Sequence, residues 1–195
     1  MNLHSYIKQV NIRYNSGISG EHAYRTDLEN LLRELVSGIE VTNEPEKVTD
    51  CGNPDFVITK EKVPIGYIEA KDVGSDLGSK EFKEQFDRYR KALDNLILTD
   101  YLHFQFVEHG KTVHEIRIGE IEGKSVKAAG KNFAEFENLI KNFCAFVGQT
   151  ITSPAKLAEM MAAKARLLQN ILERVITSDE KTRENTSYGS ERQNL

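Results

Sequence analysis

Apolar side chains recur at helical spacing in four stretches of the chain, and polar residues fill the positions between them. These stretches cover residues 20–37, 80–93, 133–147 and 154–176. Ser19 and Ser79 precede the first two stretches, where a serine can cap a helix, and Gly38 ends the first. The pattern predicts four amphipathic helices, whereas residues 1–18 fit either a short helix or an extended arm.

Short apolar or alternating runs lie between the first three helical stretches, and they predict six strands. The runs are residues 39–43, 56–59, 65–71, 95–99, 103–107 and 112–118. A turn at residues 59–64 can fold the second and third runs into a hairpin, and residues 108–111 can do the same for the last two. Residues 119–130 are predicted to form a loop; its lysines could contact phosphate, but a solvated loop is the favoured interpretation. The order of these elements predicts an α/β fold in which helices flank a central mixed sheet.

The third predicted strand ends in a group of charged residues. Period-2 geometry places Glu69 and Lys71 on one face of this strand and Ile68 and Ala70 on the other. The predicted hairpin brings Asp55, at the start of the preceding strand, close to Glu69. Two carboxylates beside a lysine can hold Mg²⁺, while the lysine steers or deprotonates a water that attacks a phosphate.

The ordinary alternative for this group is a solvated strand face, where Glu and Lys two residues apart are common. Two features favour a functional site instead. The pair stands at the end of an apolar run, and Pro54 rigidifies the backbone immediately before Asp55. The sequence therefore makes Asp55, Glu69 and Lys71 the primary candidates for chemistry.

Two of the predicted helices carry a polar residue on an otherwise apolar face. Gln85 lies between two phenylalanines and shares its face with Tyr89, one turn later. A buried amide there is either a satisfied core residue or a contact to a metal-bound water, a phosphate or the lysine. Glu21 continues the inward face of the first helix through Tyr24 and Leu28, either as a charge that complements the helix dipole or as an acid aimed at a site.

Composition narrows the class of protein. The chain has 195 residues, 39% of them hydrophobic and 29% charged, as in a globular domain with a substantial core. Its net charge of −4 gives no global basic field for nucleic acid, although a nuclease can offset its acids with bound metal. Cys51 and Cys144 match no zinc spacing and suggest a reducing cytoplasm, and no segment has the length and apolarity of a membrane span. We expect a domain over residues 1–176, followed at 177–195 by a polar tail or a truncated linker.

The order of elements, with Asp and Glu-X-Lys on the middle strands, resembles the PD-(D/E)XK nuclease superfamily. The segment from Gln85 to Tyr89 matches the Q-x-x-x-Y element of its RecB-like members. Over roughly residues 15–175, five segments look like the Mrr-like nuclease domain at the N-terminus of single-chain Type ISP restriction–modification enzymes. These segments are residues 21–25, 42–45, 52–56, 66–72 and 95–101. The resemblance implies a restriction-endonuclease-like core with extra C-terminal helices.

The resemblance also implies a Mg²⁺ site, in which Mn²⁺ can substitute. Asp55, Glu69 and the backbone carbonyl of Ala70 would bind the ion, and Glu21 would be a further acid near it. Lys71 would orient the attacking water and stabilise charge on the phosphate and, like Tyr89, would contact DNA. Gln85 would support the lysine or a metal-bound water, and Tyr89 would hold either its own helix or the DNA backbone.

These implications define an expected function: a Mg²⁺-dependent endonuclease that cleaves double-stranded DNA without reading its sequence. The chain has no G-x-x-x-x-G-K-[ST] phosphate loop and no glycine-rich methyl-donor loop, so translocase and methyltransferase domains would be partners in the same or another chain. Two nuclease copies could meet transiently to break both strands. The alternatives are a catalytically inactive DNA or protein interaction domain, and a stand-alone repair or RNA nuclease on the same fold.

Overall fold

The computed structural model describes residues 1–17, 22–45, 52–145 and 161 of the chain. The chain divides into two compact units, Met1–Gly148 and Gln149–Leu195, and the first unit contains the sheets and the helices that cover them. Glu21, the predicted helix over 154–176 apart from residue 161, and the tail over 177–195 lie outside the described residues. Within the described part of the chain, no helix has both the length and the apolar character needed to cross a membrane.

Six strands form one mixed sheet in the order β1-β2-β3-β4-β5-β6. They are β1 (Glu40–Asn43), β2 (Phe56–Lys60), β3 (Val63–Ala70), β4 (Asn95–Thr99), β5 (His103–Glu108) and β6 (Lys111–Arg117). Strands β3 and β4 run parallel, because a helical crossover joins them, and every other neighbouring pair is antiparallel. All six predicted strands are present within two residues of their predicted ends, and the predicted mixed sheet is confirmed.

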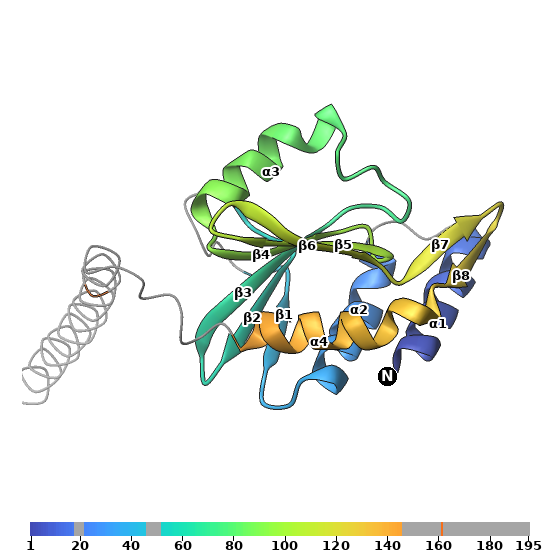
Figure 1. Cartoon of the computed structure of the whole chain (residues 1–195), viewed down its shortest axis with the longest axis horizontal. Helices are drawn as coiled ribbons and strands as arrows, with labels where there is room; N and C mark the ends of the chain where they lie inside the picture. The colour runs from blue at the N-terminus through green and yellow to red at the C-terminus, as the bar shows by residue number, and fades with distance from the viewer. Residues whose placement is uncertain (18–21, 46–51, 146–160, 162–195) are drawn as a thin grey trace, which may run out of the picture. The chain divides into compact units, whose positions relative to one another are not determined.

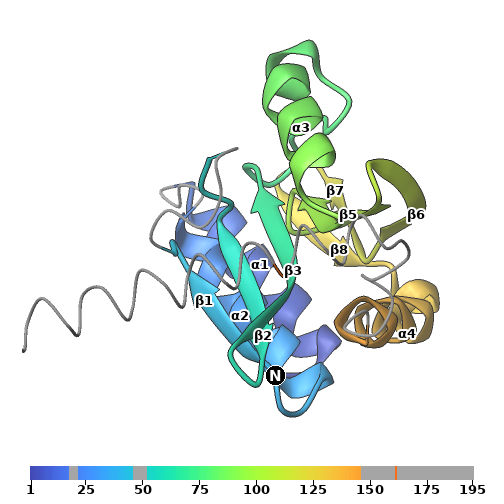
Figure 2. The same cartoon turned by 90° about the vertical axis from the view of Figure 1, so that its left-hand side faces the viewer.

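Helices cover both faces of the sheet (Figures 1 and 2). Of the helices in the described part of the chain, the crossover helix α3 (Lys80–Ala92) is the one that covers the first face. The opposite face is covered by α1 (Leu3–Ser16), α2 (His22–Leu35) and α4 (Phe133–Cys144). Ser79 caps α3 as predicted, because its hydroxyl accepts a hydrogen bond from the Glu81 amide. Of the two alternatives left open for the N-terminal segment, the helix is the one observed.

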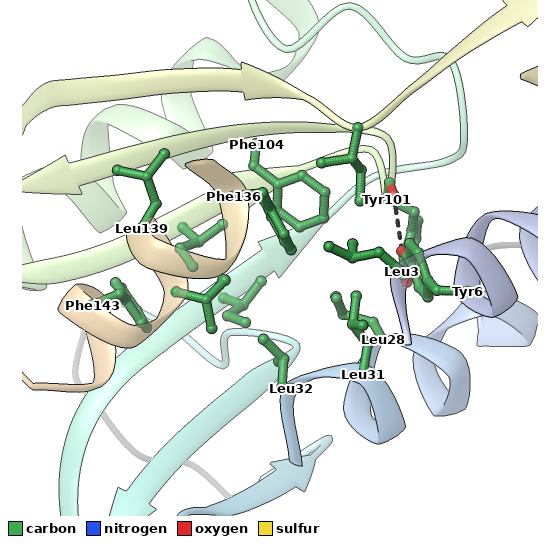
Figure 3. Packing of buried hydrophobic residues seen from close by; sticks show 14 of the residues in the cluster. Leu3, Tyr6, Leu28, Leu31, Leu32, Tyr101, Phe104, Phe136, Leu139 and Phe143 are labelled. Atoms are coloured by element: carbon green, nitrogen blue, oxygen red, sulfur yellow. Dashed lines mark hydrogen bonds between the residues drawn. The ribbon is translucent and has the colours of Figure 1, made fainter. Parts of the chain in front are cut away.

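The two sheet faces carry separate hydrophobic clusters. The larger cluster joins α1, α2 and α4 to alternate strand positions that include Phe56, Ile68 and Phe104, and Figure 3 shows part of it. The smaller cluster packs α3, through Phe86, onto the other positions, including Leu98. Because side chains alternate along a strand, burying Ile68 under the three helices sends Glu69 to the α3 face. Packing of the core therefore decides which face carries the predicted site.

The prediction of a loop over residues 119–130 is wrong. This segment forms a second, two-stranded sheet, β7 (Gly119–Glu122) with β8 (Ser125–Ala128), followed by a 3-10 turn at Gly130–Asn132. The Val126 side chain is buried, and its amide donates a hydrogen bond of 2.7 Å to Asn11 Oδ1 on α1. A hairpin this short needs a surface to pack on. That surface comes from a helix more than 100 residues earlier, so a local pattern could not predict it.

Tyr6 anchors α1 to the sheet. Its side chain is fully buried, and its hydroxyl donates a hydrogen bond of 2.8 Å to the Tyr101 carbonyl (Figure 3). Burial raises the pKa of Tyr6 well above its usual value, which keeps the hydroxyl protonated as a donor.

We expect Tyr6→Phe to lower the free energy of unfolding by about 1–2 kcal/mol, because the Tyr101 carbonyl loses this donor without regaining water. Urea unfolding measures the change, with Tyr14→Phe on the same helix as the control; equal stabilities of the two variants would contradict this role.

Candidate functional site

Glu69, Lys71 and Gln85 form a closed triangle of contacts between the end of β3 and helix α3. Lys71 Nζ lies 2.8 Å from Glu69 Oε1 and donates a second hydrogen bond of 2.8 Å to Gln85 Oε1. Gln85 Nε2 donates to the same Glu69 oxygen, also at 2.8 Å. The amide thus orients both charged groups at once, because its oxygen accepts from the lysine and its nitrogen donates to the acid.

This triangle is largely closed off from solvent. Glu69 is 3% exposed, and Lys71 Nζ lies over the rings of Phe82 and Phe86, 5.3 and 5.8 Å from their centroids. Charges in such surroundings interact more strongly than in water, and they require partners to be tolerated there. The lysine ammonium is therefore held in one position by three kinds of contact: a carboxylate, an amide and aromatic faces.

Asp55 joins this group across the β2–β3 hairpin. The strand register pairs Phe56 with Ile68, which confirms the predicted hairpin. Asp55 Oδ2 accepts a hydrogen bond of 2.8 Å from the Ala70 amide. The Asp55 carboxylate is thus fixed against the backbone of the residue that follows Glu69. The structure therefore brings together Asp55, Glu69, Ala70, Lys71 and Gln85, and the roles assigned to them stay predictions.

Arg25 is the residue that the sequence analysis did not identify. Its Nη2 donates to Asp55 Oδ1 at 2.5 Å, and its Nη1 donates to Glu44 Oε1 at 2.6 Å. The residue is only 5% exposed, although it is charged and lies on a surface helix. The sequence feature that could have identified it is its spacing. Arg25 precedes Leu28 by three and Leu32 by seven positions, so it shares their inward helix face. His22, in contrast, is exposed, with its Nδ1 3.1 Å from Glu44 Oε1.

Tyr89 holds the segment before Asp55 against α3. Its hydroxyl donates a hydrogen bond of 2.9 Å to the Asn53 carbonyl, and the residue is 2% exposed. Gly52 passes so close that an added Cβ would lie 3.3 Å from the tyrosine oxygen. The hydrogen bond to Asn53 is a contact of the kind predicted for holding helix α3 in place. The predicted contact between Tyr89 and the DNA backbone stays a prediction.

The donor set of the site fits a hard divalent cation. The carboxylates of Asp55 and Glu69 and the carbonyl of Ala70 are oxygen donors of the kind that Mg²⁺ and Mn²⁺ prefer. Within the described ranges, no three or more His, Cys, Asp or Glu side chains gather as a metal-binding group. Among the described residues, the candidate ligands are therefore two acids and a backbone oxygen, and the predicted third acid, Glu21, lies outside them.

A solvent-open hollow adjoins the Asp55 side of the site. Its volume is about 290 Å³. It is lined by Arg25, Glu44, Pro45, Asn53, Pro54 and Asp55. One water molecule takes up about 30 Å³ in the liquid, so the hollow has room for a hydrated cation together with a phosphate group. The carboxylate that would hold a metal is thus accessible from solution.

Comparison with known proteins supports the fold. No protein-family model and no curated protein sequence matches the chain. Among solved structures, a chain from the cryo-EM structure of the DrdV–DNA complex is similar, with a TM-score of 0.57 and 19% sequence identity. The alignment covers 74% of this chain and 96% of that chain. The likeness is one of fold, and it confirms the predicted class: an α/β fold with a central mixed sheet flanked by helices.

Proposed function

We propose that this chain is a divalent-metal-dependent endonuclease that hydrolyses the phosphodiester backbone of double-stranded DNA. The observation that carries the proposal is the Glu69–Lys71–Gln85 triangle, fixed beside the Asp55 carboxylate by the Ala70 amide. DNA is the proposed substrate because the similar chain belongs to a complex with DNA. The resemblance of the motifs to Type ISP nuclease domains supports the same choice.

We assign each residue of the site a separate role in hydrolysis. Asp55, Glu69 and the Ala70 carbonyl would hold Mg²⁺ or Mn²⁺. When bound, the ion polarises the phosphate and makes water a better nucleophile. Lys71 orients the attacking water and stabilises the negative charge that develops on the phosphate. Gln85 restricts the lysine to one position, so that little reorganisation is needed when that charge appears.

The order of binding follows from charge. Asp55 and Glu69 are each paired with one cation of this chain and Glu44 adds a further acid, so the metal-free site has no net positive charge to attract a phosphate. A metal ion held by these residues would supply that charge and would therefore bind before DNA. The net charge of −4 on the whole chain points the same way, since the protein offers no general attraction for nucleic acid. Sequence specificity and translocation would come from domains other than this one, and two nuclease copies could act together to break both strands.

The second candidate function is a catalytically inactive interaction domain on the same fold. One observation favours it: each acid of the site is paired within the protein, Asp55 with Arg25 and Glu69 with Lys71. Each pair is electrically neutral, so the site needs no metal ion to compensate the charge of its acids. A metal titration separates the two candidates, because a domain that binds no divalent ion gains no thermal stability from it.

An RNA or repair nuclease is distinguished by comparing cleavage of single-stranded, structured and RNA substrates.

The proposal predicts that the chain nicks supercoiled plasmid in Mg²⁺ or Mn²⁺ and that EDTA stops the reaction. Asp55→Asn should abolish nicking, because a neutral amide keeps the size of the side chain but is a far poorer ligand for a hard cation. Gel analysis of relaxed and linear plasmid measures the rate, and thermal unfolding with and without metal is measured on the same samples. Neither cleavage nor a metal-dependent thermal shift in the wild-type chain would contradict the proposal. A thermal shift without cleavage would indicate a nuclease that needs DNA delivered by a motor domain.

A further inference from the structure

We infer that Arg25 acts as an internal cation for the metal site. Its charge holds Asp55 in place when no metal is bound, and it lowers the affinity of the site for the metal ion that takes its place beside Asp55. The inference rests on the proposed metal-dependent function and adds a positioning residue to it. Arg25 touches a candidate metal ligand directly, through Nη2 at 2.5 Å from Asp55 Oδ1. The other Asp55 oxygen accepts from the Ala70 amide. Both carboxylate oxygens are therefore engaged by donors of this chain.

The burial of Arg25 shows that its charge is directed at Asp55. The residue is 5% exposed and lines the hollow beside Asp55, so its guanidinium forms part of the wall of the site. Asp55 is also largely buried, with 14% of its side chain accessible. Glu44, the other acid on Arg25, is 64% exposed, so water screens its share of the interaction. The strong interaction is therefore the one with Asp55.

The charges of the site explain why such a cation is needed. Glu69 is buried on β3 and Asp55 is half-buried immediately before the adjacent strand β2, and leaving either carboxylate without a partner would cost several kcal/mol. Lys71 balances Glu69, and Arg25 balances Asp55. The site can thus fold and stay ordered with no metal bound.

The same contact has a cost for metal binding. A neighbouring arginine lowers the affinity of a carboxylate for a proton by about 10- to 1,000-fold, and a divalent ion meets the same positive field. The ion must also compete for Oδ1 of Asp55, which Arg25 already contacts. Removing the charge of Arg25 is therefore expected to destabilise the metal-free protein and to strengthen metal binding. A purely structural arginine would produce the first effect without the second.

The test measures metal affinity rather than cleavage. Mn²⁺ is titrated into the full chain by calorimetry, and thermal unfolding is followed without and with saturating Mn²⁺. For Arg25→Gln we expect a lower melting temperature without metal, a larger upward shift with metal, and a Kd at least about tenfold tighter than that of the wild type. For Arg25→Lys, which keeps the charge, we expect a Kd within about threefold of the wild type. An unchanged or weaker Kd in Arg25→Gln would overturn the inference.

Arg13→Gln is the matched control, because Arg13 forms a similar contact to an aspartate away from the site, with Nε 2.6 Å from Asp27 Oδ2. We expect it to lower stability and to leave the Mn²⁺ affinity unchanged. A tighter Kd in Arg13→Gln would mean that any loss of an arginine–aspartate pair has this effect, which would also overturn the inference.

Glu44→Gln keeps the inference testable if Arg25→Gln does not fold. The exposed Glu44 side chain can be replaced without disturbing the core, and its loss removes one acid that shares the charge of Arg25 with Asp55. We expect the Mn²⁺ affinity to weaken by about threefold in this variant, and an unchanged or tighter Kd would count against the inference. The proposed function fails separately: it fails if the wild-type chain binds no metal, or if Asp55→Asn binds it as tightly as the wild type does.

Discussion

Lys71→Met is expected to lower the rate of DNA cleavage by about 100- to 1,000-fold, the usual effect of removing one fixed group that stabilises charge in a transition state. The methionine keeps an unbranched chain of similar length beside Phe82 and Phe86, whose rings lie close to the Lys71 Nζ. What it removes is the ammonium group and its two polar contacts. Glu69 keeps its hydrogen bond from Gln85 but loses its positive partner, so this variant is also expected to unfold at a lower temperature.

Single-turnover cleavage of supercoiled plasmid measures this effect, with thermal unfolding to show that the variant is folded. Lys83→Met is the matched control: Lys83 is an exposed residue of α3 whose ammonium contacts Asp87 at 2.5 Å. We expect it to cleave at the wild-type rate, because a surface ion pair contributes little to stability and this one does not touch the site. Cleavage by Lys71→Met at the rate of Lys83→Met would remove Lys71 from the mechanism.

Gly66→Ala is expected to lower the free energy of unfolding by about 1–3 kcal/mol, as overpacking of a filled core does. A Cβ at this position of β3 would lie 2.4 Å from Cζ and 2.5 Å from Cε1 of Phe143. The ring cannot simply move aside, because Phe143 is buried in the main cluster and its carbonyl accepts a hydrogen bond of 3.0 Å from Asn95. Displacing it would disturb the contact between the end of α4 and the sheet.

Chemical denaturation compares Gly66→Ala with Gly130→Ala, whose added Cβ would meet no atom within 4 Å. We expect the second variant to stay within about 0.5 kcal/mol of the wild type, as substitutions away from packed sites do. Phe143→Leu should partly rescue Gly66→Ala, because the smaller side chain makes room for the methyl group. Equal stability of the two alanine variants would show that Phe143 does not pack against Gly66 in solution.

Much of the site could be predicted because its parts are set by local geometry. Glu69 and Lys71 share a strand face through the two-residue period, and Gln85 shares a helix face with Tyr89 through the four-residue spacing. A hairpin turn between two short apolar runs placed Asp55 beside this group. Each of these relations spans few residues, so the chain's pattern is enough to indicate it.

Arg25 could not be found in the same way. Its partner Asp55 is 30 residues away, on an element that the helix meets only in the folded chain. Spacing placed Arg25 on the inward face of α2, but no local rule states which acid it meets or that it is buried. The β7–β8 hairpin was missed for a related reason, since Val126 finds its partner Asn11 at a separation of 115 residues.

Periodicity and turn chemistry were enough to predict the α/β class, the six strands of the main sheet, and the acids, lysine and glutamine that the site brings together. Both kinds of signal act over a few residues, so they can be recognised in the unfolded chain. The strand order, the face of the sheet on which the site lies, and the pairing of Asp55 with Arg25 became known only from the folded molecule. Those features depend on which surfaces bury one another, and burial is a property of the whole folded chain.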